Sequence, residues 1–208
     1  MEQSEQKNNE WDIDNLPNRL TMFRVLLIPI IIGTLSLIQT EWAWAQQNKV
    51  LLGYIAGWTC VVASITDFFD GWIARRRGIV TLFGSFLDPI ADKFLVVSSL
   101  ILLQALGRVH VLIVIVLVLR EIYITALRLL AYERELIVPV SKLAKWKTAL
   151  QLIAIPMLMP DDIPWGIPMT LIGQILISIC TLLSVYSALE YSYNLLRKMK
   201  HKRLKDEK

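Results

Sequence analysis

Histidine and cysteine are scarce in this chain, which has two of each among its 208 residues. Cys60 and Cys180 each lie inside an apolar run, so we expect neither a disulfide framework nor a zinc site and assign both to packing. His110 and His201 belong to no H-x-K-x₄-D pattern, and the sequence contains no P-loop or dinucleotide fingerprint. A phosphohistidine route and a covalent serine or cysteine nucleophile are therefore unsupported.

Charge is also sparse. Charged residues make up 19% of the sequence, hydrophobic residues make up 55%, and the mean hydropathy is +0.50. This composition is too apolar for an ordinary soluble domain. The opening segment MEQSEQKNNEWDID is polar and acidic, unlike a cleavable signal peptide or an Arg-rich transit peptide. We therefore predict one polytopic membrane domain, residues 1–208, inserted directly into a bacterial-type inner membrane, and expect no nucleic-acid partner.

The apolar segments predict an all-α integral membrane protein, a bundle of six transmembrane helices. The predicted spans cover about residues 20–39, 50–74, 83–106, 109–131, 143–159 and 165–196. A polar arm, residues 1–19, precedes them, and a basic tail, residues 197–208, follows them. Trp11, Ile13 and Leu16 fit a short N-terminal interfacial segment, with a disordered tail as the alternative.

Lysine and arginine are distributed unevenly among the predicted loops. Most of the 22 lie in the N-terminal arm, the 75–77 turn, the 134–147 connection and the tail, whereas Lys49 and Arg108 lie on the opposite side. Because cytoplasmic loops of membrane proteins carry an excess of these residues, both termini are predicted to be cytoplasmic.

Four aspartates interrupt the second and third apolar segments: Asp67, Asp70, Asp88 and Asp92. At 100° per residue the first pair lies about 60° apart and the second about 40° apart, so each pair shares a helix face. Both pairs are expected roughly 6–12 Å inside the same interface. Carboxylates at that depth need a bound cation or a charged partner.

Oxygen-only ligands favour a hard ion such as Mg²⁺, with Mn²⁺ or Ca²⁺ as alternatives. Gly71 and Ala74 make the helix face beside Asp67 and Asp70 flat, so a planar ligand can approach the backbone while its phosphates reach the metal. Packing between helices through small residues is the alternative for the flat face. A divalent-cation transporter, with the acids as a transit site, is the alternative of a different class.

The full pattern is Asp67-x-x-Asp70-Gly71-x-x-Ala74-Arg75, eight residues, Gly84, three residues, Asp88, three residues, Asp92. In every defined position it resembles the signature of the CDP-alcohol phosphatidyltransferase family. The resemblance implies a homodimer of six-helix subunits in which the four aspartates hold two divalent ions per subunit, Mg²⁺ or Mn²⁺. It also implies that an alcohol displaces CMP from a CDP-linked lipid and that Asp92 accepts the hydroxyl proton.

The resemblance further assigns residues to the CDP-lipid. The nucleotide and its phosphates are expected at the two aspartates of the first pair and at Gly71, Ala74, Arg75 and Gly84. The opening Pro17-Asn18-Arg19-Leu20-Thr21-x-x-Arg24 also resembles the family's first helix, which adds Asn18, Thr21 and Arg24. Helix capping by Asn18 with an interfacial Arg24 is the alternative for that segment.

Basic residues in the second half of the chain are candidates for an acceptor that carries its own phosphate. Arg120 ends the apolar run VLIVIVLVL, Arg128 follows two turns later, and Lys142, Lys145 and Lys147 begin the next predicted helix. Arginine at that depth faces a bundle interior or a wet cavity and suits bidentate phosphate recognition. Anchoring to anionic membrane lipids is the alternative, chiefly for the lysines.

Three further segments are similar to those members of the family that use glycerol 3-phosphate. They are LDPIADK (87–93), Arg120-Glu121 and Ser141-x-x-x-Lys145-x-Lys147-Thr148-x-x-Gln151. The resemblance therefore implies transfer of a phosphatidyl group from CDP-diacylglycerol to glycerol 3-phosphate. Serine, inositol phosphate and phosphatidylglycerol are the alternative acceptors.

Overall fold

A computed structural model describes residues 16–77, 82–134, 136 and 142–206. Inside these ranges it does not describe the side chains of residues 16–20, 68–77, 82–88, 142, 144, 201 and 203–206. The predicted interfacial segment at Trp11 and Ile13 lies outside the described residues.

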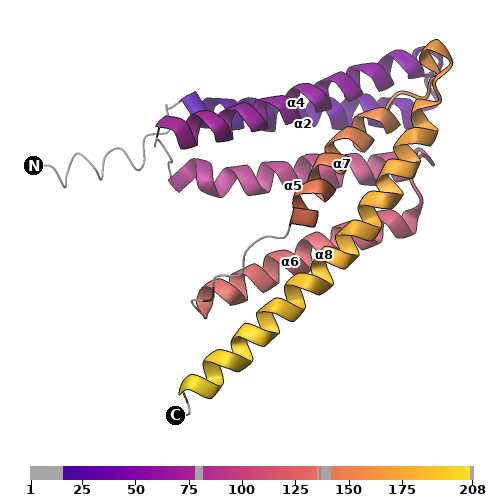
Figure 1. Cartoon of the computed structure of the whole chain (residues 1–208). Coiled ribbons are helices and arrows are strands. Elements are labelled where there is room, and N and C mark those ends of the chain that lie inside the picture. Colours follow the sequence, from indigo (N-terminus) through magenta and orange to yellow (C-terminus); the bar gives the residue numbers. More distant parts are fainter. Residues whose placement is uncertain (1–15, 78–81, 135, 137–141, 207–208) are drawn as a thin grey trace, which may run out of the picture.

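The described chain is helical, without strands (Figure 1). Its long helices are α2 (Leu16–Gln39), α4 (Lys49–Arg77), α5 (Leu82–Ala105), α6 (Val111–Glu133), α7 (Lys142–Leu158) and α8 (Met169–Asp206). A short helix, α3 (Ala43–Gln47), joins α2 to α4, and a 3₁₀ turn, η1 (Pro164–Gly166), lies between α7 and α8. Each long helix covers one of the predicted apolar segments.

Three helices are long and apolar enough to cross a membrane, over Thr21–Gln39, Lys49–Asp67 and Met169–Lys200 of the described residues. Helix α6 carries three charged residues in its apolar run, and α7 has only 17 residues. The all-α, membrane-embedded class is therefore confirmed, while six crossings stay a prediction.

Three helix boundaries differ from the prediction by four residues or more, one of them the start of α8, which lies at Met169 instead of about residue 165. Helix α2 begins at Leu16, so the end of the predicted arm is helical, and Pro17 lies in the first turn, where a missing N–H costs little. Helix α8 continues to Asp206 through most of the predicted basic tail. Its 38 residues span about 57 Å, which exceeds a hydrocarbon core of about 30 Å.

The helices form two groups. Helix α2 packs against α4 and α5, α8 packs against α6 and α7, and contacts between α4 and α7 join the groups. The groups converge at the end of the bundle that holds η1 and diverge at the other end, where α2 begins and α8 ends (Figure 1). We call these the closed end and the open end.

The closed end is tightly packed. A Cβ atom on Gly53 of α4 would lie 2.5 Å from the Met159 carbonyl oxygen and 2.8 Å from Pro160 Cα, so the chain after α7 passes directly over this glycine. Cys60 and Cys180 are both free and buried in the apolar core, which confirms their assignment to packing. The core therefore holds the two groups together away from the open end.

Alanine at Gly53 should destabilise the protein by about 1–3 kcal/mol, because the clash is with backbone and cannot be relieved by a rotamer change. Gly33→Ala in α2 is the control, since nothing lies within 4 Å of a Cβ at that position. Thermal unfolding in detergent should show a lower midpoint for Gly53→Ala alone. Equal midpoints for the two variants would contradict the close approach of α7 to α4.

Candidate active site

A buried arginine joins the first three long helices at the open end. Arg24 of α2 has a fully buried side chain, and its Nη1 atom lies 2.5 Å from Asp67 Oδ1 of α4 and 2.7 Å from Asp92 Oδ1 of α5. A buried guanidinium in an apolar bundle is costly unless anions neutralise it. The three residues, here named the Arg24 cluster, are thus held together by charge.

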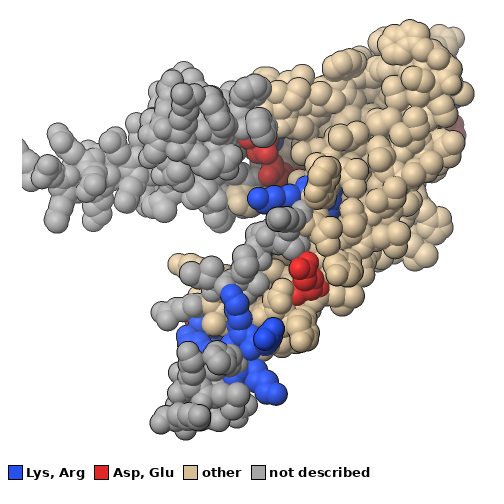
Figure 2. Space-filling view, viewed as in Figure 1, with Lys and Arg blue, Asp and Glu red and all other residues tan. Residues whose placement is uncertain are grey.

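The Arg24 cluster brings one member of each predicted acid pair to a single point. The Asp67 and Asp92 side chains are 37% and 51% exposed, whereas the arginine behind them is buried. The carboxylates are therefore open to a ligand arriving from outside the bundle. Figure 2 shows acidic and basic atoms gathered around the hollow at the open end, whereas the described face of the closed end is mostly uncharged.

The remaining acids continue the same helices. Helix α4 extends through position 70, one turn beyond Asp67, and α5 includes position 88, one turn before Asp92, but both side chains lie outside the described residues. Among the described side chains no three His, Cys, Asp or Glu residues form a metal-binding group. The donor chemistry nevertheless fits a hard divalent cation, because carboxylate oxygens from two helices already converge on one positive charge.

Basic residues form a second cluster between the helices of the other group. Arg120 of α6 donates from Nε to the Ser184 carbonyl (3.2 Å), from Nη2 to Ser187 Oγ (2.7 Å) and from Nη1 to Glu121 Oε1 (3.0 Å). Lys147 of α7 also pairs with Glu121 Oε1. Glu121 therefore neutralises two cations, and the set, here named the Glu121 cluster, ties α6 to α7 and α8.

The predicted acceptor residues separate into two environments. Arg120 and Lys147 have side chains only 10% and 5% exposed and are occupied by the contacts of the Glu121 cluster. Arg128 of α6 and Lys145 of α7 are exposed. Arg120 and Lys147 would have to exchange protein contacts to bind a phosphate, whereas Arg128 and Lys145 lie at the surface.

Several predicted residues have no described side chain. They are Asn18, Asp70, Gly71, Ala74, Arg75, Gly84, Asp88 and Lys142. Thr21, also assigned to the CDP-lipid, is buried one turn before Arg24 on α2.

Sequence reasoning assigned no role to Glu121, Ser184 or Ser187, which hold the predicted acceptor residues in place. The signal for Glu121 was an acid beside an arginine in an apolar helix, where each charge needs a partner. The signal for the serines was two hydroxyls three residues apart in α8, which share a helix face. Their pairing with Arg120 depended on how α6 and α8 pack.

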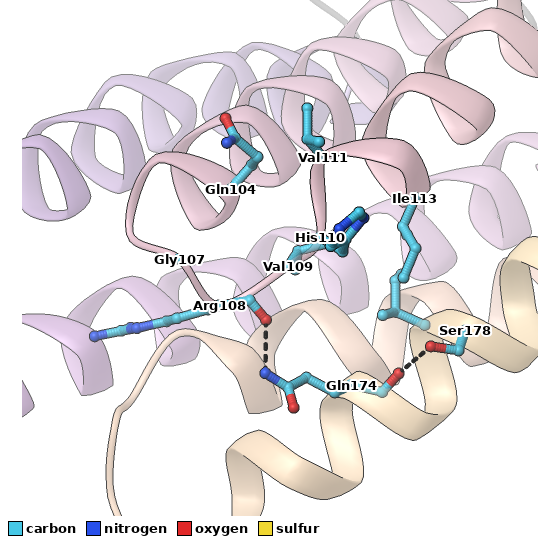
Figure 3. A pocket seen from close by; sticks show the side chains of 10 residues that line it. Gln104, Gly107, Arg108, Val109, His110, Val111, Ile113, Gln174 and Ser178 are labelled. Carbon is cyan, nitrogen blue, oxygen red and sulfur yellow. Dashed lines mark hydrogen bonds between the residues drawn. The ribbon is translucent and has the colours of Figure 1, made fainter.

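The closed end holds a cavity of about 590 Å³ at the turn between α5 and α6 (Figure 3). The Arg108 side chain points away from it and donates to the carbonyls of Leu158 (3.3 Å) and Met159 at the end of α7. Gln174 of α8 donates to the Arg108 carbonyl (3.0 Å). No carboxylate lines this cavity, so it lacks the donors of the open end, while Arg108 caps the end of α7.

The fold and the Arg24 cluster define a membrane-embedded helical protein in which carboxylates of two helices meet a buried arginine at one end of the bundle. The chain belongs to the CDP-alcohol phosphatidyltransferase family, whose model matches residues 14–186. Members of this family generally depend on a divalent metal.

Two of the proteins similar to this chain share one enzyme name. A protein of Rickettsia bellii, named CDP-diacylglycerol–glycerol-3-phosphate 3-phosphatidyltransferase, is 38% identical over 181 residues, 86% of this chain and 93% of the relative. A protein of Bacillus subtilis with the same name is 34% identical over 180 residues, 85% of this chain and 93% of the relative. The similarity thus extends over both groups of helices.

Replacing Arg24 by Gln should lower stability by on the order of 3 kcal/mol in the presence of a chelator, because two neighbouring carboxylates lose their buried counter-charge. Millimolar Mg²⁺ should restore part of the loss. Lys49→Gln, at an exposed lysine at the start of α4, is the control. Thermal unfolding with and without Mg²⁺ measures both effects, and indistinguishable losses in the two variants would show that Arg24 does not hold the cluster.

Glu121→Gln should also destabilise the protein by on the order of 3 kcal/mol, since it leaves two buried cations beside each other. Glu133→Gln at the exposed end of α6 is the matched control and should change little. Urea or thermal unfolding in detergent gives the comparison. A stability unchanged by Glu121→Gln would mean that Arg120 and Lys147 are neutralised by other groups.

Proposed function

We propose that this chain is a metal-dependent enzyme that transfers a phosphatidyl group from CDP-diacylglycerol to the 1-hydroxyl of sn-glycerol 3-phosphate, giving phosphatidylglycerophosphate and CMP. The observation that carries the proposal is the convergence of Asp67 and Asp92 on Arg24 at the open end. The names of the relatives support the choice of donor and acceptor.

The aspartates are proposed as the metal ligands, together with Asp70 and Asp88 on the same two helices. Two Mg²⁺ or Mn²⁺ ions per subunit would neutralise the diphosphate and lower the pKa of the attacking hydroxyl. Asp92 is proposed to accept the hydroxyl proton, and its half-exposed carboxylate is consistent with access to a soluble alcohol.

The donor and acceptor would meet above the Arg24 cluster. Asn18, Thr21, Arg24, Gly71, Ala74, Arg75 and Gly84 are proposed to bind the cytidine diphosphate. The acceptor oxygen forms a bond to the phosphatidyl phosphorus, the bond from that phosphorus to the bridging oxygen breaks, and CMP leaves with the electron pair.

The acceptor phosphate is proposed to bind first at Arg128 and Lys145, which are exposed, and near Lys142. Arg120 and Lys147 extend this basic region inward, where Glu121 fixes their positions. The exposed cations are consistent with an acceptor that carries its own phosphate, because arginine and lysine bind phosphate through charged hydrogen bonds.

The membrane arrangement is part of the proposal. One domain, residues 1–208, would cross the inner membrane six times with both termini cytoplasmic, and the start of α2 and the end of α8 at the same end of the bundle support an even number of crossings (Figure 1). The excess of basic residues at the open end supports a cytoplasmic site. A homodimer follows from the family resemblance alone.

Purified protein in detergent with Mg²⁺ and CDP-diacylglycerol should release CMP with glycerol 3-phosphate and not with serine, inositol phosphate or phosphatidylglycerol. Asp92→Asn should lower the rate by at least about a hundredfold, since the proton acceptor and a metal ligand are lost together. Release with serine alone would overturn the acceptor. No CMP with any acceptor, combined with Mn²⁺ flux into vesicles, would indicate a transporter.

Lys145→Ala should raise the KM for glycerol 3-phosphate by at least about tenfold, the equivalent of one lost charged hydrogen bond, while the KM for CDP-diacylglycerol stays unchanged. Lys200→Ala, at an exposed lysine in the last turns of α8, is the control for general loss of positive charge. Steady-state kinetics with each substrate varied in turn makes the measurement. Equal changes in both KM values would remove Lys145 from the acceptor site.

A further inference from the structure

The Glu121 cluster holds two cations and one carboxylate. Arg120 Nη1 lies 3.0 Å from Glu121 Oε1, and Lys147 Nζ pairs with the same oxygen. Among the described residues, no other carboxylate pairs with either cation. The cluster therefore contains one positive charge more than its carboxylate neutralises, inside a helical bundle where an uncompensated charge is costly.

The three charged side chains differ in exposure in a way that suits an exchange of anions. The Glu121 side chain is 24% exposed, whereas those of Arg120 and Lys147 are 10% and 5% exposed. The other donors of Arg120 are held by α8, through the Ser184 carbonyl and the Ser187 hydroxyl. The arginine is thus fixed to the protein by several contacts, and the carboxylate is the most exposed member of the cluster.

An anion that enters this cluster must compete with Glu121 for the two cations. A phosphate monoester carries a charge between about −1.5 and −2 at neutral pH and has three strong acceptor oxygens. It can therefore neutralise both cations, which one carboxylate does not do. A phosphodiester or another carboxylate carries a single charge, so it would only reproduce the contacts that Glu121 already makes.

We propose that Glu121 selects the charge of the acceptor, because it occupies Arg120 and Lys147 until a phosphate monoester displaces it. The inference rests on the proposed function, and it adds the residue that determines this part of the specificity. Phosphatidylglycerol, whose phosphate is a diester, and serine, whose carboxylate has one charge, are then poor acceptors. Inositol phosphate is a monoester and is not excluded by its charge.

A purely structural role for Glu121 is the alternative. In that case the carboxylate would only stabilise the bundle, and its loss would affect all acceptors alike. The two roles therefore differ in one measurable quantity, the ratio of the KM values for a singly and a doubly charged acceptor. The methyl phosphodiester of sn-glycerol 3-phosphate is a suitable probe, because it keeps the 1-hydroxyl and has one negative charge fewer.

In wild-type protein with Mg²⁺ and CDP-diacylglycerol, the KM for the methyl diester should be at least about tenfold higher than that for glycerol 3-phosphate, the equivalent of one charged hydrogen bond. Glu121→Gln should lower this ratio by at least about fivefold, because no carboxylate then competes with either acceptor. Glu133→Gln, at the exposed end of the same helix, should keep the wild-type ratio. Steady-state CMP release with each acceptor varied in turn makes the measurement.

A double variant covers the case in which Glu121→Gln does not fold, since that change leaves two buried cations beside each other. Glu121→Gln combined with Lys147→Gln leaves Arg120 as the single cation of the cluster, which then keeps the net charge of the wild type. Its KM ratio should also fall below the wild-type ratio, because a monoanion is enough to neutralise one cation. Since the net charge is unchanged, a lower ratio assigns the selection to the carboxylate itself.

The outcomes separate this inference from the proposed function. A wild-type protein that releases no CMP with either acceptor would overturn the proposed function. An active wild type with equal KM values for the two acceptors would overturn the role of Glu121 alone. A wild-type ratio retained in the active Glu121→Gln or double variant would do the same, and would leave the carboxylate a structural role.

Discussion

The structure depends on the neutralisation of charge inside an apolar bundle. Arg24 is fully buried, and the cost of removing its charge from water is offset because Asp67 and Asp92 lie within 2.7 Å of the same nitrogen. This requirement fixes the rotation of α2, α4 and α5 about their own axes, since any of them turned by half a circle would leave a charge without a partner. The same contact holds the candidate catalytic carboxylate at the open end.

The Glu121 cluster imposes the same constraint on the other group of helices. Glu121 is placed between Arg120 and Lys147, and the serines of α8 complete the coordination of the arginine. Each group of helices therefore contains one ionic cluster. In the proposed reaction one cluster receives the diphosphate and the other the acceptor phosphate, so the geometry of transfer depends on how the two groups are held relative to each other.

The closed end holds the two groups of helices in a fixed position relative to each other. Gly53 lets the chain after α7 pass directly over α4, and Arg108 caps the carbonyls at the end of α7 from the turn between α5 and α6. Contacts of this kind tolerate little displacement because interiors are close-packed. The site at the open end can therefore expose its carboxylates to substrates without relying on local packing for stability.

The sequence by itself determined the helical class, the approximate position of every long helix and the acids and bases proposed for the chemistry, because apolar segments must be helical in a membrane and each intramembrane charge is costly enough to stand out. It did not determine where α2 begins or α8 ends, since polar residues continue a helix without any change in hydropathy. The two partners of Arg24 and the contacts of Glu121 with Arg120 and Lys147 were decided only by tertiary structure. The physical reason is that pairing and cavity shape depend on the rotation and separation of helices far apart in the chain, which helical periodicity leaves open.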